Sequence, residues 1–194
     1  MTKLDDILRV RKPAPAHPVI APVAVRWSPR FYSGEKIPRE HLDTMFEAAR
    51  WAPSAHNRQP WQFFFTEKGS DHYGKIFSAL NGYNQSWAGT APVLVLACAE
   101  TKAGGKANQF CYYDLGAAVL AFVLQAQALG YHARQMGLFD REKVRKFFRL
   151  KPDLEPFIVI AVGRIGNYEE APDAIVKMEL DPRPRKTGIA TELK

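Results

Sequence analysis

Two short, continuously apolar runs constrain the fold of this chain more than any other feature. PVLVLACA spans residues 92–99 and PFIVIAVG spans residues 156–163. A strand with one face in water alternates apolar and polar residues, whereas an unbroken apolar run is typical of a strand that is buried on both faces. Both runs therefore predict central strands of a sheet that is covered by helices on each side.

The apolar residues around these runs follow helical spacing. The longest helix is predicted over residues 107–129, and Gly130 is placed to end it. Its core-facing side is predicted to consist of Leu115, Ala118, Val119, Phe122, Val123, Ala126 and Leu129. Shorter helices are predicted over residues 38–51, 73–80 and 141–150, and an aromatic strand over residues 61–66. Strands that alternate with helices in this way predict a three-layer α/β or α+β sandwich.

One domain is expected from 194 residues with 46% apolar content. Residues 1–25 are predicted to be an extension, a short helix followed by a proline-rich arm, and residues 26–194 a single domain whose tail lacks a strong pattern after residue 167. Cys98 and Cys111 lie in apolar surroundings without the spacing of a metal or redox pair, which predicts buried free thiols. No apolar stretch approaches the roughly 18 to 20 residues that span a bilayer, and no secretory signal is evident, so we expect a cytoplasmic protein.

The net charge of +7 raises the question of a polyanionic partner. The basic residues fall into three groups: Arg26, Arg30, Lys36 and Arg39; the block from Arg134 to Lys151; and Arg183, Arg185, Lys186 and Lys194. We expect residues 141–151 to form the solvated face of a helix, which leaves the first and last groups for a ligand that carries a phosphate. The alternative is a nucleic-acid-binding module that stacks bases on Trp27, Trp51, Trp61 and Trp87. Those tryptophans lie at helix and strand junctions, where packing in the core is their usual role.

Two motifs offer groups that could hold such a ligand. RWSPRFY, residues 26–32, places Arg26, Ser28 and Arg30 at alternating positions, so an extended segment would point all three the same way. Two guanidinium groups that flank a hydroxyl suit a phosphate, although an ordinary surface strand is the simpler interpretation of this motif alone. APSAHNRQPWQFF, residues 52–65, follows a helix with polar side chains that suit a planar heterocycle, or that simply end the helix.

Taken in order, these motifs resemble the N-terminal part of the nitroreductase family of flavoenzymes. NGYNQSW, the long helix that ends in ALG, the loop QMGLFD, the strand FIVIAVGR and the closing DPRPRK continue the resemblance over residues 26–186. The resemblance implies an FMN-binding homodimer with a three-layer α-β-α sandwich of the α+β class. Its central mixed sheet would be completed by the partner's C-terminal tail, residues 167–194, which crosses between the subunits.

The resemblance also assigns site residues. Arg26, Trp27, Ser28 and Arg30 match the phosphate and ring contacts of the family, and Arg183 and Arg185 match its C-terminal phosphate contacts. Pro53, Ser54, Ala55 and Asn57 match a segment that the second subunit supplies. Asn84 matches a contact to the ring edge, Met136 and Gly137 match a loop against the flavin, and Gly163 and Arg164 are weaker candidates.

The implied activity is ping-pong electron transfer from NAD(P)H, through bound FMN, to small acceptors such as nitroaromatics or quinones. The flavin carries the hydride, so no catalytic side chain and no metal is expected. Dehalogenation, flavin fragmentation and oxygen reduction are the alternatives within the family. Two departures bear on the substrate: TKAGGKA stands where many relatives insert helices that roof the flavin, and Met136 replaces an acidic residue.

Overall fold

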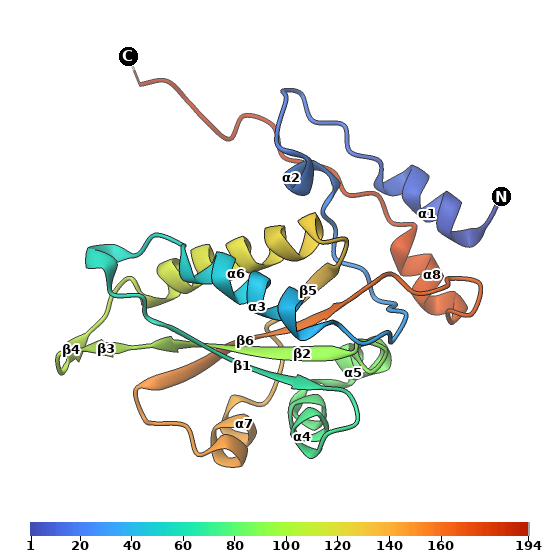
Figure 1. The fold of residues 1–194 in the computed structure, drawn as a ribbon. Coiled ribbons are helices and arrows are strands. Elements are labelled where there is room, and N and C mark those ends of the chain that lie inside the picture. Colours follow the sequence, from blue (N-terminus) through green and yellow to red (C-terminus); the bar gives the residue numbers. More distant parts are fainter. Residues whose placement is uncertain (194) are drawn as a thin grey trace.

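A four-stranded sheet crosses the middle of the molecule in a computed structural model, which describes residues 1–193 (Figure 1). Its strands, in order across the sheet, are β1 (Trp61–Glu67), β2 (Val93–Glu100), β6 (Leu154–Gly163) and β5 (His132–Met136). The two apolar runs form β2 and β6, the central strands, as predicted. Every neighbouring pair is antiparallel, so the expected mixed sheet would require a parallel strand from a second subunit.

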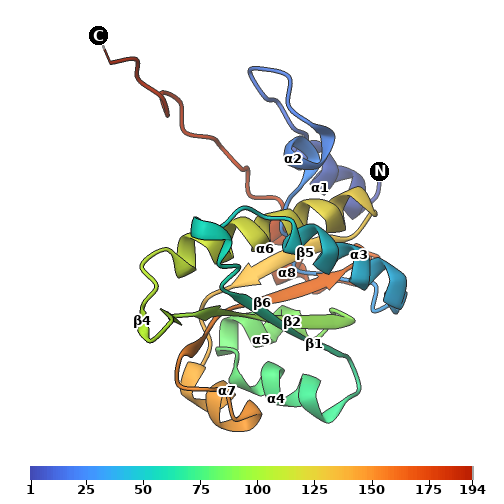
Figure 2. The ribbon, with the colours of Figure 1, turned by 60° about the vertical axis from the view of Figure 1, so that its left-hand side comes forward.

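Helices cover both faces of this sheet and give three layers (Figures 1 and 2). One face carries α3 (Arg39–Arg50) and α6 (Cys111–Ala128), and the other carries α4 (Asp71–Ala79), α5 (Gly82–Ala88) and α7 (Arg141–Phe148). Successive residues of β2 point to opposite faces: Val93 and Val95 pack with α3 and α6, whereas Leu94 and Leu96 pack into the core on the other side. The α+β sandwich is therefore confirmed.

The long helix begins later than predicted. Residues 101–107 form a small hairpin, β3 (Lys102–Ala103) and β4 (Lys106–Ala107), and α6 starts only at Cys111. The hairpin turns at Gly104 and Gly105, whose positive φ values of 56° and 76° suit glycine and end any helical pattern there. At the other end, Gly130 has φ +78°, the left-handed conformation of a helix C-terminal glycine, as predicted.

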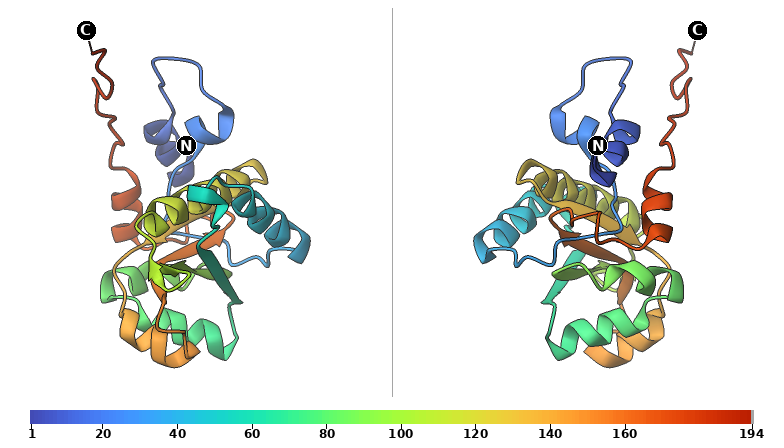
Figure 3. Two further views of the ribbon diagram at one scale, coloured as in Figure 1. Left: turned by 90° about the vertical axis from the view of Figure 1, so that its left-hand side faces the viewer. Right: turned by 90° about the vertical axis from the view of Figure 1, so that its right-hand side faces the viewer.

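The helices nearest the two ends of the chain lie side by side (Figure 3). Helix α1 (Lys3–Arg11) packs beside α8 (Asp173–Glu179), and Ile7 and Ile175 are buried in the same core cluster. A second short helix, α2 (Ala21–Val25), lies in the proline-rich arm. The segment expected to cross to a partner thus first packs on its own chain, and only residues after α8 extend away from the body in Figure 3. Lys194 lies outside the described residues.

The cysteine and tryptophan side chains were expected to be buried, and most of them are. Cys98 and Cys111 are buried free thiols, as predicted. Trp27 and Trp87 are buried, but the expectation is wrong for Trp51, whose surface is 75% exposed because it lies just beyond the end of α3. Within residues 1–193, no helix is long and apolar enough to cross a membrane.

Candidate functional site

A cavity of about 240 Å³ lies where the N-terminal segment, β5 and the C-terminal segment meet. Six arginines line it: Arg11, Arg26, Arg30, Arg134, Arg183 and Arg185. The remaining lining residues are Trp27, Ser28, Met178 and Asp181. The structure therefore brings together the two predicted arginine groups from opposite ends of the chain, and it adds two arginines that the sequence did not indicate.

The segment that begins at Arg26 presents its alternate side chains to this cavity, and Trp27 between them lines it as well. Arg26, Ser28 and Arg30 all line it, and the Arg26 Nη1 atom lies 3.4 Å from the Ser28 hydroxyl. Arg134, on β5, donates a hydrogen bond to the Ser28 carbonyl and stacks 5.2 Å from the centre of the Trp87 ring. The Arg134 side chain thus holds the segment that contains Ser28 against β5.

The arginines repel one another. Burial lowers the pKa of Arg26, and the positive charge of Arg185 lowers it further. The pKa values of Arg134 and Arg183 are also lowered, first by burial and then by neighbouring arginines. An anion in the cavity would relieve this repulsion and would accept hydrogen bonds from planar guanidinium groups.

Arg183 and Arg185 play different parts in this arrangement. The Arg183 guanidinium donates to the carbonyl oxygens of Arg26, of Arg11 at 3.0 Å and of Ala24 at 2.9 Å. Arg185 is exposed and donates to the carbonyls of its own neighbours, Arg183 and Pro184. Arg183 therefore tethers the N-terminal segment, whereas the Arg185 guanidinium is accessible to a ligand.

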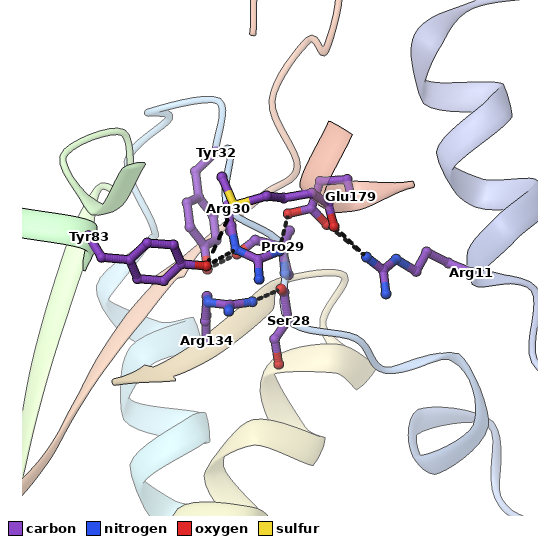
Figure 4. Close-up of polar contacts among 9 residues, drawn as sticks. Arg11, Ser28, Pro29, Arg30, Tyr32, Tyr83, Arg134 and Glu179 are labelled. Atoms are coloured by element: carbon purple, nitrogen blue, oxygen red, sulfur yellow. Dashed lines mark hydrogen bonds and ion pairs between the residues drawn. The ribbon is translucent and has the colours of Figure 1, made fainter. Parts of the chain in front are cut away.

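A buried carboxylate pairs with two of the arginines that line the cavity (Figure 4). Glu179, at the end of α8, is fully buried, and its Oε1 atom accepts from Arg30 Nη1 at 3.2 Å. Arg11 Nη2 lies 3.6 Å from the other oxygen, Oε2. On the opposite side of Arg30, the Tyr83 hydroxyl accepts from Nε at 3.1 Å. Burial raises the pKa of Glu179, and the three nearby arginines oppose that rise.

Sequence reasoning missed Arg11, Tyr83, Arg134 and Glu179. Arg134 belongs to the basic block of residues 134–151 but lies before the part of it expected on a helix, and Arg11 belongs to an extension with no assigned role. Neither residue carries a motif. Arg134 would have been found only if β5 had been predicted from the short stretch that follows Gly130.

Asn84, Met136 and Gly137 form a neighbouring group. Asn84, next to Tyr83 on α5, is buried, and its side-chain amide donates to the Leu138 carbonyl at 3.3 Å. Met136 ends β5, and its side chain is buried in the core, so it offers a ligand no more than its backbone. Asn84 thus fixes the loop that begins at Gly137.

The segment with Pro53, Ser54, Ala55 and Asn57 lies elsewhere. It contains the short helix η1 (Ala55–Asn57), and the Ala55 N–H donates to the buried Asp114 carboxylate at 3.2 Å, near the start of α6. The cavity residue Arg134 follows the other end of α6, and Ala128 at that end lies about 21 Å along the helix from Asp114 at 1.5 Å per residue. A single chain therefore does not bring this segment to the cavity.

Gly163 and Arg164, the weaker candidates, lie outside the cavity lining. A Cβ atom at Gly163 would come within 2.7 Å of the Pro92 ring, so close packing explains this glycine. The Arg164 guanidinium lies 4.7 Å from the centre of the Tyr131 ring.

Comparison with known proteins decides the family, because the model of the nitroreductase family matches residues 23–81 and 67–164. The chain belongs to the nitroreductase family. The nitroreductase-family chain is similar to the crystal structure of an oxidoreductase containing FMN, with 30% identity, a TM-score of 0.87 and coverage of 95% of this chain and 96% of that one.

Two further relatives extend the comparison of this nitroreductase-family chain. A family member from Clostridium difficile 630 shares the fold at 23% identity, with a TM-score of 0.71 and coverage of 90% of this chain and 98% of that one. A protein of Methanothermobacter thermautotrophicus, provisionally named NADH dehydrogenase/NAD(P)H nitroreductase, is 29% identical over 149 residues, 75% of this chain and 76% of that protein. The fold is therefore of the nitroreductase type.

Proposed function

We propose that this protein is an FMN-dependent oxidoreductase that passes electrons from NAD(P)H to small acceptors such as nitroaromatics or quinones. The observation that carries the proposal is the convergence of Arg26, Ser28, Arg30 and Arg185 on one cavity in a nitroreductase fold. The similar oxidoreductase that contains FMN and the provisional name of the archaeal relative support the cofactor and the electron donor.

The donor set fits a phosphomonoester. Guanidinium groups match phosphate oxygens in pairs, and the cavity is strongly positive because Asp181 and Glu179 offset only part of its six arginines. Arg11, one of the lining residues, has a buried Nε atom without a hydrogen-bond partner among residues 1–193. The phosphate of FMN is the ligand that this chemistry and the family support together.

When bound, the flavin supplies hydride acceptance and release in two half-reactions, which is a ping-pong cycle. The chain supplies position and charge. Arg26 and Arg185 would hold the phosphate, and Arg30, fixed between Glu179 and Tyr83, would place a positive charge beside the ring. Asn84 would hold the loop at Gly137 against the cofactor through its bond to the Leu138 carbonyl.

A homodimer would complete the site. The outward face of α6 carries Tyr113, 81% exposed, and Leu120, 50% exposed, with the small residues Gly116 and Ala117 between them. Such an apolar stripe on a helix suits burial against a second copy. A two-fold axis there would carry the segment with Ser54 and Asn57 toward the partner's cavity, which it does not reach within its own chain.

Mixing two variants that are each impaired in FMN binding tests whether the site is shared between subunits. Arg26→Ala removes a phosphate contact, and Asn57→Gly removes a side chain from the opposite segment while tolerating the positive φ of 54° there. Each variant alone should bind FMN more weakly than the wild type. If the site is shared, mixed dimers should regain one intact site each, because one subunit supplies Arg26 and the other supplies Asn57. Mixed dimers that bind no more FMN than either parent would contradict the arrangement.

The activity is tested by purifying the protein, recording its absorption spectrum, and adding NADH or NADPH without oxygen. We expect bound flavin that either nucleotide bleaches and that nitroaromatic or quinone acceptors reoxidise. An acceptor series that includes oxygen and halogenated aromatics separates the alternative flavin chemistries. Protein that neither carries nor takes up FMN would refute the proposal, and salt-sensitive nucleic-acid binding by colourless protein would favour the alternative.

A further inference from the structure

Helix α1 is fixed rigidly enough to place its last residue in the cavity wall. Thr2 and Asp5 form a capping box at its start, and Ile7 is fully buried in the core shared with α8. The Lys3 N–H donates to the Glu169 carboxylate at 2.7 Å, which ties the helix to the segment before α8. The extension is therefore docked on the domain, and Arg11 has a defined position at the end of α1.

Arg11 touches both the N-terminal and the C-terminal segment of the cavity wall. Its guanidinium stacks 5.3 Å from the centre of the Trp27 ring, and its Nη2 atom donates to the Met178 carbonyl at 3.2 Å. Its own carbonyl accepts from Arg183. The side chain is 12% exposed, and its Nε atom has no hydrogen-bond partner in the described chain. A buried guanidinium donor without an acceptor is uncommon, and the nearby Glu179 Oε2 atom, 3.6 Å from Nη2, also lacks a hydrogen-bond partner in the described chain.

Glu179 fixes the positions of the Arg11 and Arg30 guanidinium groups relative to each other. Its two carboxylate oxygens face the two guanidinium groups, at 3.6 and 3.2 Å, so both arginines are held in the same wall (Figure 4). One carboxylate balances one of these two charges. Arg11, Arg30 and Glu179 together therefore carry one net positive charge beside the cavity, and the carboxylate offsets part of the cost of burying the two guanidinium groups.

We propose that Arg11 is a phosphate-binding residue of the cofactor site, so that the N-terminal extension forms part of that site. The inference rests on the proposed function and deepens it, since its ligand is the phosphomonoester of FMN. Arg11 acts beside Arg26 and Arg185, and it explains why the extension docks on α8 at the mouth of an arginine-lined cavity.

Comparison of FMN with riboflavin, which lacks the phosphate, tests this inference. Flavin fluorescence titrations would use flavin-free protein and three variants: Arg11→Ala, Arg11→Lys and Arg9→Ala. Arg9 is the matched control, because it lies on the same helix, is 68% exposed and pairs with Asp6. We expect Arg11→Ala to weaken FMN binding about 10- to 100-fold, with riboflavin binding unchanged. The FMN affinity of Arg11→Lys should lie between those of the wild type and Arg11→Ala, and the affinity of Arg9→Ala should match the wild type.

Two results would overturn the assignment. One is equal FMN affinity of the Arg11→Ala and Arg9→Ala proteins. The other is an equal loss of FMN and riboflavin binding in Arg11→Ala, which would indicate a general structural role. Wild-type protein that binds neither flavin would instead refute the proposed function, and this inference with it, so the two failures are distinguishable.

Discussion

Replacing Arg183 with alanine should loosen the N-terminal arm. The guanidinium joins three carbonyls on that arm, those of Arg11, Ala24 and Arg26. Hydrogen bonds from charged donors contribute about 1.5–3 kcal/mol each, and water replaces part of that at the partly exposed Arg183, so we take about 3 kcal/mol for the three bonds together. This corresponds to an increase of about 100-fold in the population of the opened arm.

Hydrogen exchange on flavin-free protein measures this opening directly, so that loss of bound cofactor does not contribute to the comparison. The amides of Val23, Ala24 and Arg26 are hydrogen bonded within and just after α2, so they report on the arm. Arg185→Ala is the control, because the bonds of Arg185 go to its own neighbours. We expect faster exchange in the Arg183 variant alone. Equal exchange of α2 in both variants would refute the tether.

Three further predictions concern the cavity and the proposed interface. Arg26→Ala or Arg185→Ala should weaken FMN binding about 10- to 100-fold without lowering the unfolding midpoint, and unchanged flavin stoichiometry would count against the phosphate contacts. Burial lowers the pKa of His132 from 6.5 to about 4, so the unfolded chain binds its proton first as the pH falls; about 2 kcal/mol of stability should be lost between pH 7.5 and 5. In denaturant titrations, the His132→Phe variant should not lose this stability between pH 7.5 and 5. The same pH dependence of stability in the variant and the wild type would contradict the prediction. Leu120→Arg on α6 should yield monomers by light scattering with weakened FMN retention; an intact dimer would exclude this face.

The sequence predicted the helices and strands whose buried residues follow a regular pattern. β2 and β6 have unbroken apolar runs because both of their faces are covered, and α6 repeats apolar residues at helical spacing because one side packs on the sheet. β5 was missed, since an edge strand of five residues with His132, Arg134 and Gln135 has no clear alternation. α8 was missed because seven residues are too few for a helical period to stand out.

The candidate site was predicted where motifs carry it and missed where only the fold creates it. Arg26, Ser28 and Arg30 share a short motif, so their common direction follows from extended backbone. Arg11, Arg134 and Glu179 come from three separate elements, and a charged residue in isolation is expected in solvent. Their convergence depends on the docking of α1 on α8 and on the position of β5, neither of which a local pattern specifies.

That convergence couples cofactor binding to the order of both chain ends. Arg183 binds the arm, Arg11 stacks on Trp27, and Glu179 joins Arg11 to Arg30, so each end of the chain is held partly through the other. The cavity also gathers mutually repelling arginines, and a bound anion removes that repulsion. A ligand that binds only the assembled state stabilises it by mass action. The proposed FMN would therefore add to the contacts that already dock the N-terminal helix and the start of the C-terminal segment, and flavin loss would weaken the docking of both together.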